Sequence, residues 1–204
     1  MAKLPEPPVP LDLPPTLVTV PAGTRCWRIY SAGGAYPTAW QDFRFFGPGA
    51  TRFDHHDLPP SVQARGILYG ATTPLTCLAE VFQATRVIDR AARSPWLVAF
   101  DLVHDVAMLD LTGTWPTRAG ASMAINSGPR PRARRWSRAI YAAYPDVLGL
   151  LYASSMNSNA TSFAFYERAL SAMPAAPAFH RALSDPALVP RLDAAATTLG
   201  YGLL

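Results

Sequence analysis

Cysteine, charge and long apolar segments are all scarce in this sequence. The chain has 204 residues and two cysteines, Cys26 and Cys77, which are too few for a disulfide framework and are not spaced as zinc ligands. Both have apolar neighbours, so we expect small core residues in a reducing compartment. Charged residues make up 16 % of the chain and the net charge is +4. A nucleic-acid-binding protein of this size is usually more basic, so direct contact with nucleic acid is not expected.

Targeting and membrane signals are missing as well. No segment approaches the about 18 consecutive apolar residues that a membrane span needs. The N-terminal segment is interrupted by prolines and lacks the apolar stretch of a signal peptide. We therefore expect a cytoplasmic protein without membrane contact.

Several familiar catalytic motifs are also absent. The sequence has no phosphate-binding P-loop, no GxGxxG after a strand and no GxSxG elbow. None of the four histidines, His55, His56, His104 and His180, lies in a zinc-binding motif. The adjacent pair His55–His56 is expected to be exposed in a loop rather than to bind a metal. No metal site is predicted.

Proline, by contrast, is abundant and unevenly placed. Seven of the 21 prolines lie within residues 1–24, which predicts a proline-rich arm that is either disordered or ordered on the surface. Residues 25–204 are expected to form a single domain, because a chain of this length supports one good core.

The pattern of short apolar segments predicts an α+β fold rather than a doubly wound parallel sheet. Strands are predicted at Cys26–Tyr30, Phe43–Phe46, Ile67–Ala71, Trp96–Leu102, Val106–Leu111, Val147–Ala153 and Ser162–Tyr166. Helices are predicted at Leu75–Thr85, Trp136–Tyr144 and Asp185–Leu199. Thr72 or Thr73 caps the first of these helices, and Pro74 fits its first position.

Two segments between these elements are rich in residues that favour loops or bear charge. Residues 113–131 contain many Gly, Pro, Ser and Thr residues and are predicted to form a long loop. The arginine-rich run that follows is read either as a solvated basic loop or as a contact for phosphate or an acidic partner: Arg130, Arg132, Arg134, Arg135 and Arg138.

A sparse polar set accompanies the apolar strands. Arg28 lies within the predicted strand CWRIY, and Arg52 follows the glycine turn GPGAT, where a ligand can approach the backbone closely. Tyr69 lies in ILYGA, and Glu80 follows it by eleven residues within an apolar helix. Burying a carboxylate among apolar residues costs free energy, so we expect Glu80 to have a binding partner or a function. Ser154 closes the segment LLYA.

Read together, CWRIY, GATRF, ILYGATTPLTCLAEV and LLYASS resemble the RES-domain family, which is named for an arginine, a glutamate and a serine. Arg28, Glu80 and Ser154 take those places in that order, over roughly residues 25–170. The chain has Ala153 where the family often has a proline before its serine. For that reason Ser154 and the adjacent Ser155 both stay candidates.

The resemblance implies a fold similar to ADP-ribosyltransferases, with Glu80, Arg28 and Ser154 as catalytic residues and Arg52, Tyr69 and Ser155 at the substrate. It implies a toxin of a bacterial type II toxin–antitoxin pair that depletes NAD by hydrolysis or phosphorolysis of the nicotinamide–ribose bond. NAD is then a substrate rather than a cofactor, with inorganic phosphate as a candidate co-substrate. The implied partner is an antitoxin with a helical DNA-binding portion.

These residue types suit that reaction. A carboxylate beside the ribose stabilises the positive charge that develops as nicotinamide leaves, as in glycoside hydrolysis. Arginines offer paired donors to a pyrophosphate, and a tyrosine offers a ring for stacking and a polar hydroxyl. Two alternatives stay open: an ADP-ribosyltransferase that modifies a protein, and a catalytically inactive binding module.

Overall fold

The computed structural model describes residues 4–204, so the first three residues of the proline-rich arm lie outside it. Nine strands form one mixed sheet in the order β1-β7-β8-β9-β4-β2-β6-β10, with β3 paired beside β4. Their bounds are β1 Leu17–Val20, β2 Arg25–Ser31, β3 Arg44–Gly47, β4 Ser61–Ala71, β6 Pro95–Asp101, β7 Val106–Asp110, β8 Gly149–Ala153, β9 Thr161–Tyr166 and β10 Phe179–Ala182.

The strands of the main sheet pair antiparallel except β7 and β8, which are parallel. Two short strands, β5 Val87–Ile88 and β11 Gly202–Leu203, pair in parallel apart from it. The helices are α1 Pro74–Val81, α2 Trp115–Arg118, α3 Arg130–Ala143 and α4 Val189–Leu199, with 3-10 turns η1 Met123–Ile125, η2 Glu167–Ala172 and η3 Pro186–Leu188. The predicted α+β class is confirmed.

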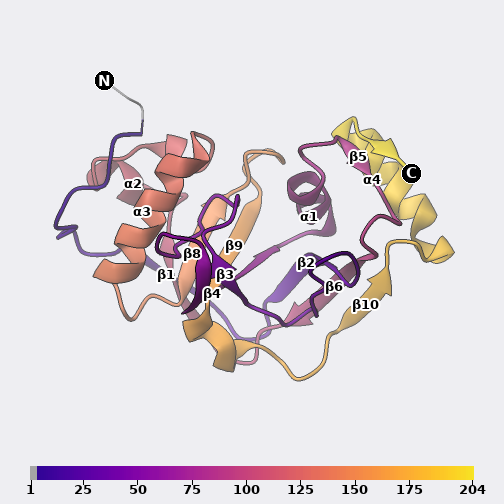
Figure 1. Ribbon diagram of the computed structural model, residues 1–204, viewed down its shortest axis with the longest axis horizontal. Coiled ribbons are helices and arrows are strands. Elements are labelled where there is room, and N and C mark those ends of the chain that lie inside the picture. The colour runs from indigo at the N-terminus through magenta and orange to yellow at the C-terminus, as the bar shows by residue number, and fades with distance from the viewer. Residues whose placement is uncertain (1–3) are drawn as a thin grey trace.

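The helices lie at different places along the sheet. Figure 1 shows α2 and α3 at one end of the molecule, α4 at the other, and α1 between them. The buried side chains form three groups: one under α2 and α3 around Trp115 and Trp136, one in the middle around Phe100 and Phe165, and one under α4 around Leu192. None of the helices in residues 4–204 is long and apolar enough to cross a membrane.

Helix α1 forms where its sequence predicts. The Thr73 side chain accepts a hydrogen bond from the Thr76 backbone N–H at 3.2 Å, and Pro74 occupies the first turn. Thr73 is therefore the cap, not Thr72. The helix ends at Val81 rather than at Thr85, because the chain turns at Phe82 and leads into β5.

The proline-rich arm, from residue 4 onward, is ordered on the surface. Its end forms β1, which pairs with β7. Upstream, the backbone carbonyls of Pro5 and Pro14 accept hydrogen bonds from the indoles of Trp136 at 2.8 Å and Trp115 at 3.2 Å. Proline-rich backbone leaves its carbonyls free of internal hydrogen bonds, which makes them available to these donors.

The predictions for residues 113–138 need correction. The expected long loop contains α2 and a 3-10 turn, and α3 begins at Arg130 rather than at Trp136. The arginine run is thus helical, not a solvated loop. Arg132 and Arg135 form ion pairs with Glu6 of the arm at 3.1 and 2.5 Å. The arm supplies the acidic partner that the local sequence did not reveal.

The prediction of exposed histidines is wrong as well. His55 and His56 are fully buried. His56 Nδ1 lies 2.5 Å from the Asp54 carboxylate, which also receives an ion pair from Arg44 at 2.8 Å. The His55 ring stacks on Tyr141 of α3 with ring centroids 4.3 Å apart. Both imidazoles are buried because carboxylates and aromatic rings surround them.

Candidate active site

Glu80 and Ser154 meet between α1 and the end of β8. The Ser154 hydroxyl donates to Glu80 Oε1 at 2.6 Å, and its oxygen accepts from the Met156 backbone N–H at 3.2 Å. With its oxygen engaged by that N–H, the hydroxyl proton is directed at the carboxylate. Ser154 is fully buried, whereas Ser155 is exposed. Ser154 is therefore the serine that contacts Glu80.

The second carboxylate oxygen of Glu80 faces Gln83. The Gln83 amide donates to Glu80 Oε2 at 3.3 Å and to the Glu80 backbone carbonyl at 2.6 Å. The Gln83 carbonyl in turn accepts from Arg130 at 2.7 Å. Sequence reasoning missed both Gln83 and this place for Arg130. Gln83 lies two residues beyond the end of α1. In the longer helix that the sequence predicts, Gln83 follows Glu80 by three residues, a spacing typical of neighbours on one helix face, and that spacing was the available signal.

Arg28 lies on β2 with its guanidinium inside the protein. Its Nη1 donates to the backbone carbonyls of Trp40 at 2.7 Å and Asp42 at 3.0 Å. Burial lowers the pKa of Arg28 to about 10, and the charge of Asp42 opposes that shift. The side chain stays cationic at neutral pH, so it brings a positive charge to the wall of the site.

Tyr69 and Arg52 are coupled through the turn that carries the arginine. The Tyr69 hydroxyl donates to Thr51 Oγ1 at 3.2 Å and accepts from the Phe53 backbone N–H at 3.1 Å. Arg52, between those two residues, donates to the Gly128 carbonyl at 2.5 Å. Burial and the charge of Arg130 lower the pKa of Arg52, while Glu80 raises it. Tyr69 thereby holds the turn that places Arg52 near Arg130 and Glu80.

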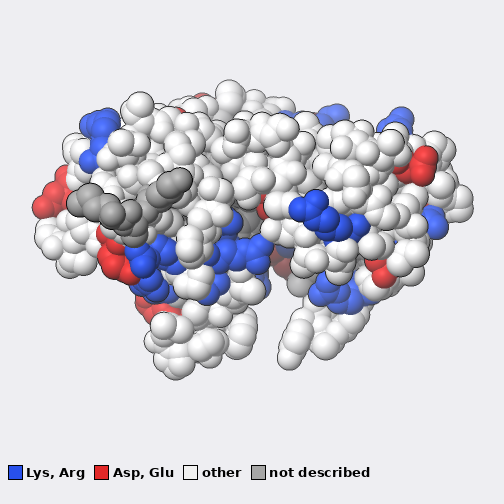
Figure 2. Space-filling view, turned by 90° about the horizontal axis from the view of Figure 1, so that it is seen from above, with Lys and Arg blue, Asp and Glu red and all other residues white. Residues whose placement is uncertain are grey.

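A cavity of about 60 Å³ brings most of these residues together. It is lined by Arg28, Ile29, Tyr69, Gly70, Ala71, Cys77, Glu80, Val81, Tyr152 and Ser162. Ligand pockets usually measure about 300–1,000 Å³, so only one end of a large ligand fits inside and the rest lies along the surface. Figure 2 shows Lys and Arg side chains along the central hollow of the surface seen from above.

Tyr152 is a further residue that sequence reasoning missed. It lies on β8, two residues before Ser154, and its ring packs against Phe53 with centroids 4.7 Å apart. Burial, together with the charge of Glu80, raises the pKa of Tyr152 well above its usual value. Side chains two residues apart along a strand lie on one face, so the position of Tyr152 two residues before Ser154 was the available signal.

The arrangement brings Arg28, Tyr69 and Glu80 to one cavity, places Ser154 behind the carboxylate and Arg52 beside it, and leaves Ser155 outside. Within residues 4–204, no group of three or more His, Cys, Asp or Glu side chains is arranged to hold a metal ion. The functional groups of the site are therefore a positioned carboxylate, nearby guanidinium groups and aromatic rings.

The sequence matches the RES domain family over residues 25–185. The chain belongs to the RES-domain family. The match takes in β2 to β10, including Arg28, Glu80 and Ser154, and leaves out the proline-rich arm and α4. The resemblance carried by these motifs is confirmed.

One solved structure gives a related fold for this RES-domain protein. It is the crystal structure of the M. tuberculosis MbcT–MbcA toxin–antitoxin complex, whose matching chain is 22 % identical with a TM-score of 0.56. The similarity covers 86 % of this chain and 92 % of that chain. At this level of identity the likeness concerns the fold alone. No curated protein matched the sequence.

Proposed function

We propose that this RES-domain protein is the toxin of a toxin–antitoxin pair and that it depletes NAD by cleaving the nicotinamide–ribose bond. The observation that carries the proposal is the Glu80 carboxylate, held by Ser154 at 2.6 Å beside the cavity that Arg28 and Tyr69 line. The toxin role is supported by the family and by the fold shared with a chain of a toxin–antitoxin complex. The free, buried Cys26 and Cys77 suit the reducing cytoplasm in which we place the activity.

The proposed reaction follows from the charges involved. As the bond between nicotinamide and the ribose breaks, its electron pair moves to the cationic nicotinamide nitrogen, and nicotinamide leaves as a neutral molecule. Positive charge develops on the ribose, where Glu80 stabilises it. A water molecule or phosphate then attacks the same carbon. Water gives ADP-ribose and releases a proton, whereas phosphate gives the phosphorylated ADP-ribose.

The other residues would bind and orient the substrate. Arg52 and Arg130 suit the pyrophosphate, because a guanidinium offers paired donors to phosphate oxygens. Arg28 and the Tyr69 ring would hold the nicotinamide ribose end in the cavity. The Ser154 hydroxyl would keep one oxygen of Glu80 oriented. A helical DNA-binding antitoxin that covers this site is part of the proposal.

Replacement of the proposed catalytic carboxylate tests the function. We expect Glu80→Gln, which removes the charge and keeps the shape, to slow NAD loss by about a hundredfold, because one electrostatic contact to the transition state is lost. The measurement is nicotinamide release by the purified protein. The matched control is Asp146→Asn. Asp146 is an exposed acid that does not line the cavity, so this variant is expected to keep full activity. Equal rates for Glu80→Gln and the wild type would remove Glu80 from the reaction.

The products distinguish the acceptors. Labelled NAD incubated with and without phosphate gives ADP-ribose for hydrolysis and its phosphate for phosphorolysis. Label on a protein band would instead support the alternative ADP-ribosyltransferase. No product of any kind, together with normal growth when the protein is expressed alone, would support the inactive binding module.

A further inference from the structure

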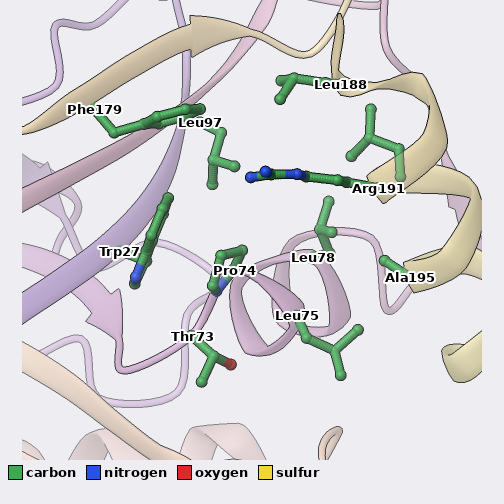
Figure 3. Close-up of a pocket in the computed structure, with 11 residues that line it drawn as sticks. Trp27, Thr73, Pro74, Leu75, Leu78, Leu97, Phe179, Leu188, Arg191 and Ala195 are labelled. Carbon is green, nitrogen blue, oxygen red and sulfur yellow. The ribbon is translucent and has the colours of Figure 1, made fainter.

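A second and larger cavity, of about 260 Å³, lies between α1, α4 and the strands β2, β6 and β10. Its walls are mostly apolar, and the side chains that matter here are Trp27, Leu78, Leu97, Phe179, Leu192 and Arg191. Figure 3 shows Trp27, Leu78, Leu97 and Phe179 around the space into which Arg191 extends. The cavity is open to the surface and lies near the lower end of the size range of ligand pockets, which is about 300–1,000 Å³, so it has room for a small molecule.

Arg191 gives the cavity a charge. Figure 3 shows its side chain extending from α4 into the cavity, between Leu78 and Leu97. Among residues 4–204 its guanidinium makes no hydrogen bond or ion pair. Arg181 on the nearby β10, in contrast, pairs with Asp185 at 2.6 Å. Arg191 is also exposed to solvent, so an anion can reach its guanidinium from outside. A guanidinium that is open to solvent on one side and faces apolar walls on the other suits an anion that brings an apolar body with it.

This cavity and the candidate active site lie on different faces of α1. Leu75 and Leu78 line the larger cavity, whereas Cys77 and Glu80 line the smaller one. The two cavities share no lining residue. An occupant of the larger cavity therefore contacts the helix that carries Glu80 without entering the proposed NAD site.

We propose that the larger cavity binds a small aromatic carboxylic acid. The rings of Trp27 and Phe179, with centroids 5.5 Å apart, form an aromatic wall against which a further ring packs. Arg191 then pairs with the carboxylate through two parallel N–H donors, the arrangement that a guanidinium makes best. The leucines of α1, β6 and α4 enclose the apolar body. The proposal does not depend on the NAD activity, since binding is measured directly.

A matched pair of probes tests the charge. By titration calorimetry we expect 3-phenylpropionate to bind the full-length protein at least about fivefold more tightly than 3-phenylpropionamide, because a partly exposed ion pair contributes about 1 kcal/mol. Arg191→Gln is expected to abolish this preference. Arg134→Gln, an arginine of α3 at the other end of the molecule, is the matched control and is expected to keep it. Equal binding of acid and amide to the wild type would overturn the proposal.

A second variant tests the location. Ala195→Phe places a ring in the cavity from α4 and is expected to abolish binding of both probes, while circular dichroism confirms an unchanged fold. Saturating NAD and the Glu80→Gln substitution are both expected to leave probe binding unchanged. Displacement of the probe by NAD would assign the cavity to the substrate, and unaltered binding to Ala195→Phe would place the probe elsewhere. Either result contradicts a separate site.

Discussion

At the scale of single residues, the contacts of Glu80 explain why this carboxylate keeps one orientation. Ser154 donates to one of its oxygens and Gln83 to the other, and Gln83 is held by Arg130 from α3. A carboxylate that is preorganised in this way loses little energy to reorientation as charge develops beside it. The proposed function therefore depends on the donors as well as on the acid.

The two adjacent serines give a prediction with a built-in control. We expect Ser154→Ala to slow NAD loss by about tenfold, because a hydrogen bond to a charged group contributes about 1.5–3 kcal/mol, part of which water replaces. Ser155→Ala is expected to have little effect, since that side chain is exposed. The measurement is nicotinamide release under identical conditions. The reverse order of effects would assign the contact to Ser155.

At the scale of elements, the sequence revealed what depends on local patterns and missed what depends on distant contacts. Helix α1 could be predicted because Thr73, Pro74 and an apolar run are consecutive. The order of strands could not, because β4 lies between β2 and β9 through pairings of residues far apart in the chain. Tyr69 is predicted to stack on a ligand through its ring. Its hydroxyl also holds the turn of Arg52, a contact that cannot be read from sequence spacing.

The cap of α1 is open to a direct test. We expect Thr73→Ala to lower the free energy of unfolding by about 1 kcal/mol, because the Thr76 backbone N–H loses its acceptor. Thr72→Ala is the matched control and is expected to change stability less, since the hydrogen bond of its exposed hydroxyl to the Thr161 carbonyl is also accessible to water. Urea unfolding followed by fluorescence gives both values. Equal losses would show that Thr73 does not act as the cap.

At the scale of the whole molecule, the proline-rich arm closes one end of the protein. Leu4 and Leu11 are buried among the side chains under α2 and α3. We expect deletion of residues 1–15 to lower the free energy of unfolding by about 3–6 kcal/mol, because two buried leucines contribute about 1.5–3 kcal/mol each. Glu6→Gln removes only exposed ion pairs and is expected to have a much smaller effect. A deletion with the wild-type urea midpoint would show that the arm only rests on the surface.

The half-buried Glu167 and the buried His55 make the stability of the whole molecule depend on pH. Burial alone would raise the pKa of Glu167, but the His55 imidazole 3.8 Å away and hydrogen bonds from the Tyr141 hydroxyl and the Gly66 backbone N–H lower it to about 2. Burial also lowers the pKa of His55, and the carboxylate of Glu167 opposes that shift. In both cases the unfolded chain binds protons more readily than the folded one, so acid favours unfolding.

The pH range over which the protein loses stability follows from the direction of each pKa shift. A group with a lowered folded pKa stabilises the protein above its unfolded pKa, which is about 6.5 for His and about 4.3 for Glu. We therefore expect the free energy of unfolding to decrease below about pH 6.5 and to decrease further from about pH 4.3 toward pH 2.

Two variants test this pH dependence. Glu167→Gln should flatten the part of the curve below pH 4.3, and Asp146→Asn, which changes an exposed acid, should leave the curve unchanged. Urea unfolding across this range measures the effect. A Glu167→Gln curve parallel to that of the wild type below pH 4.3 would show that Glu167 does not link β4, η2 and α3 as the contacts indicate.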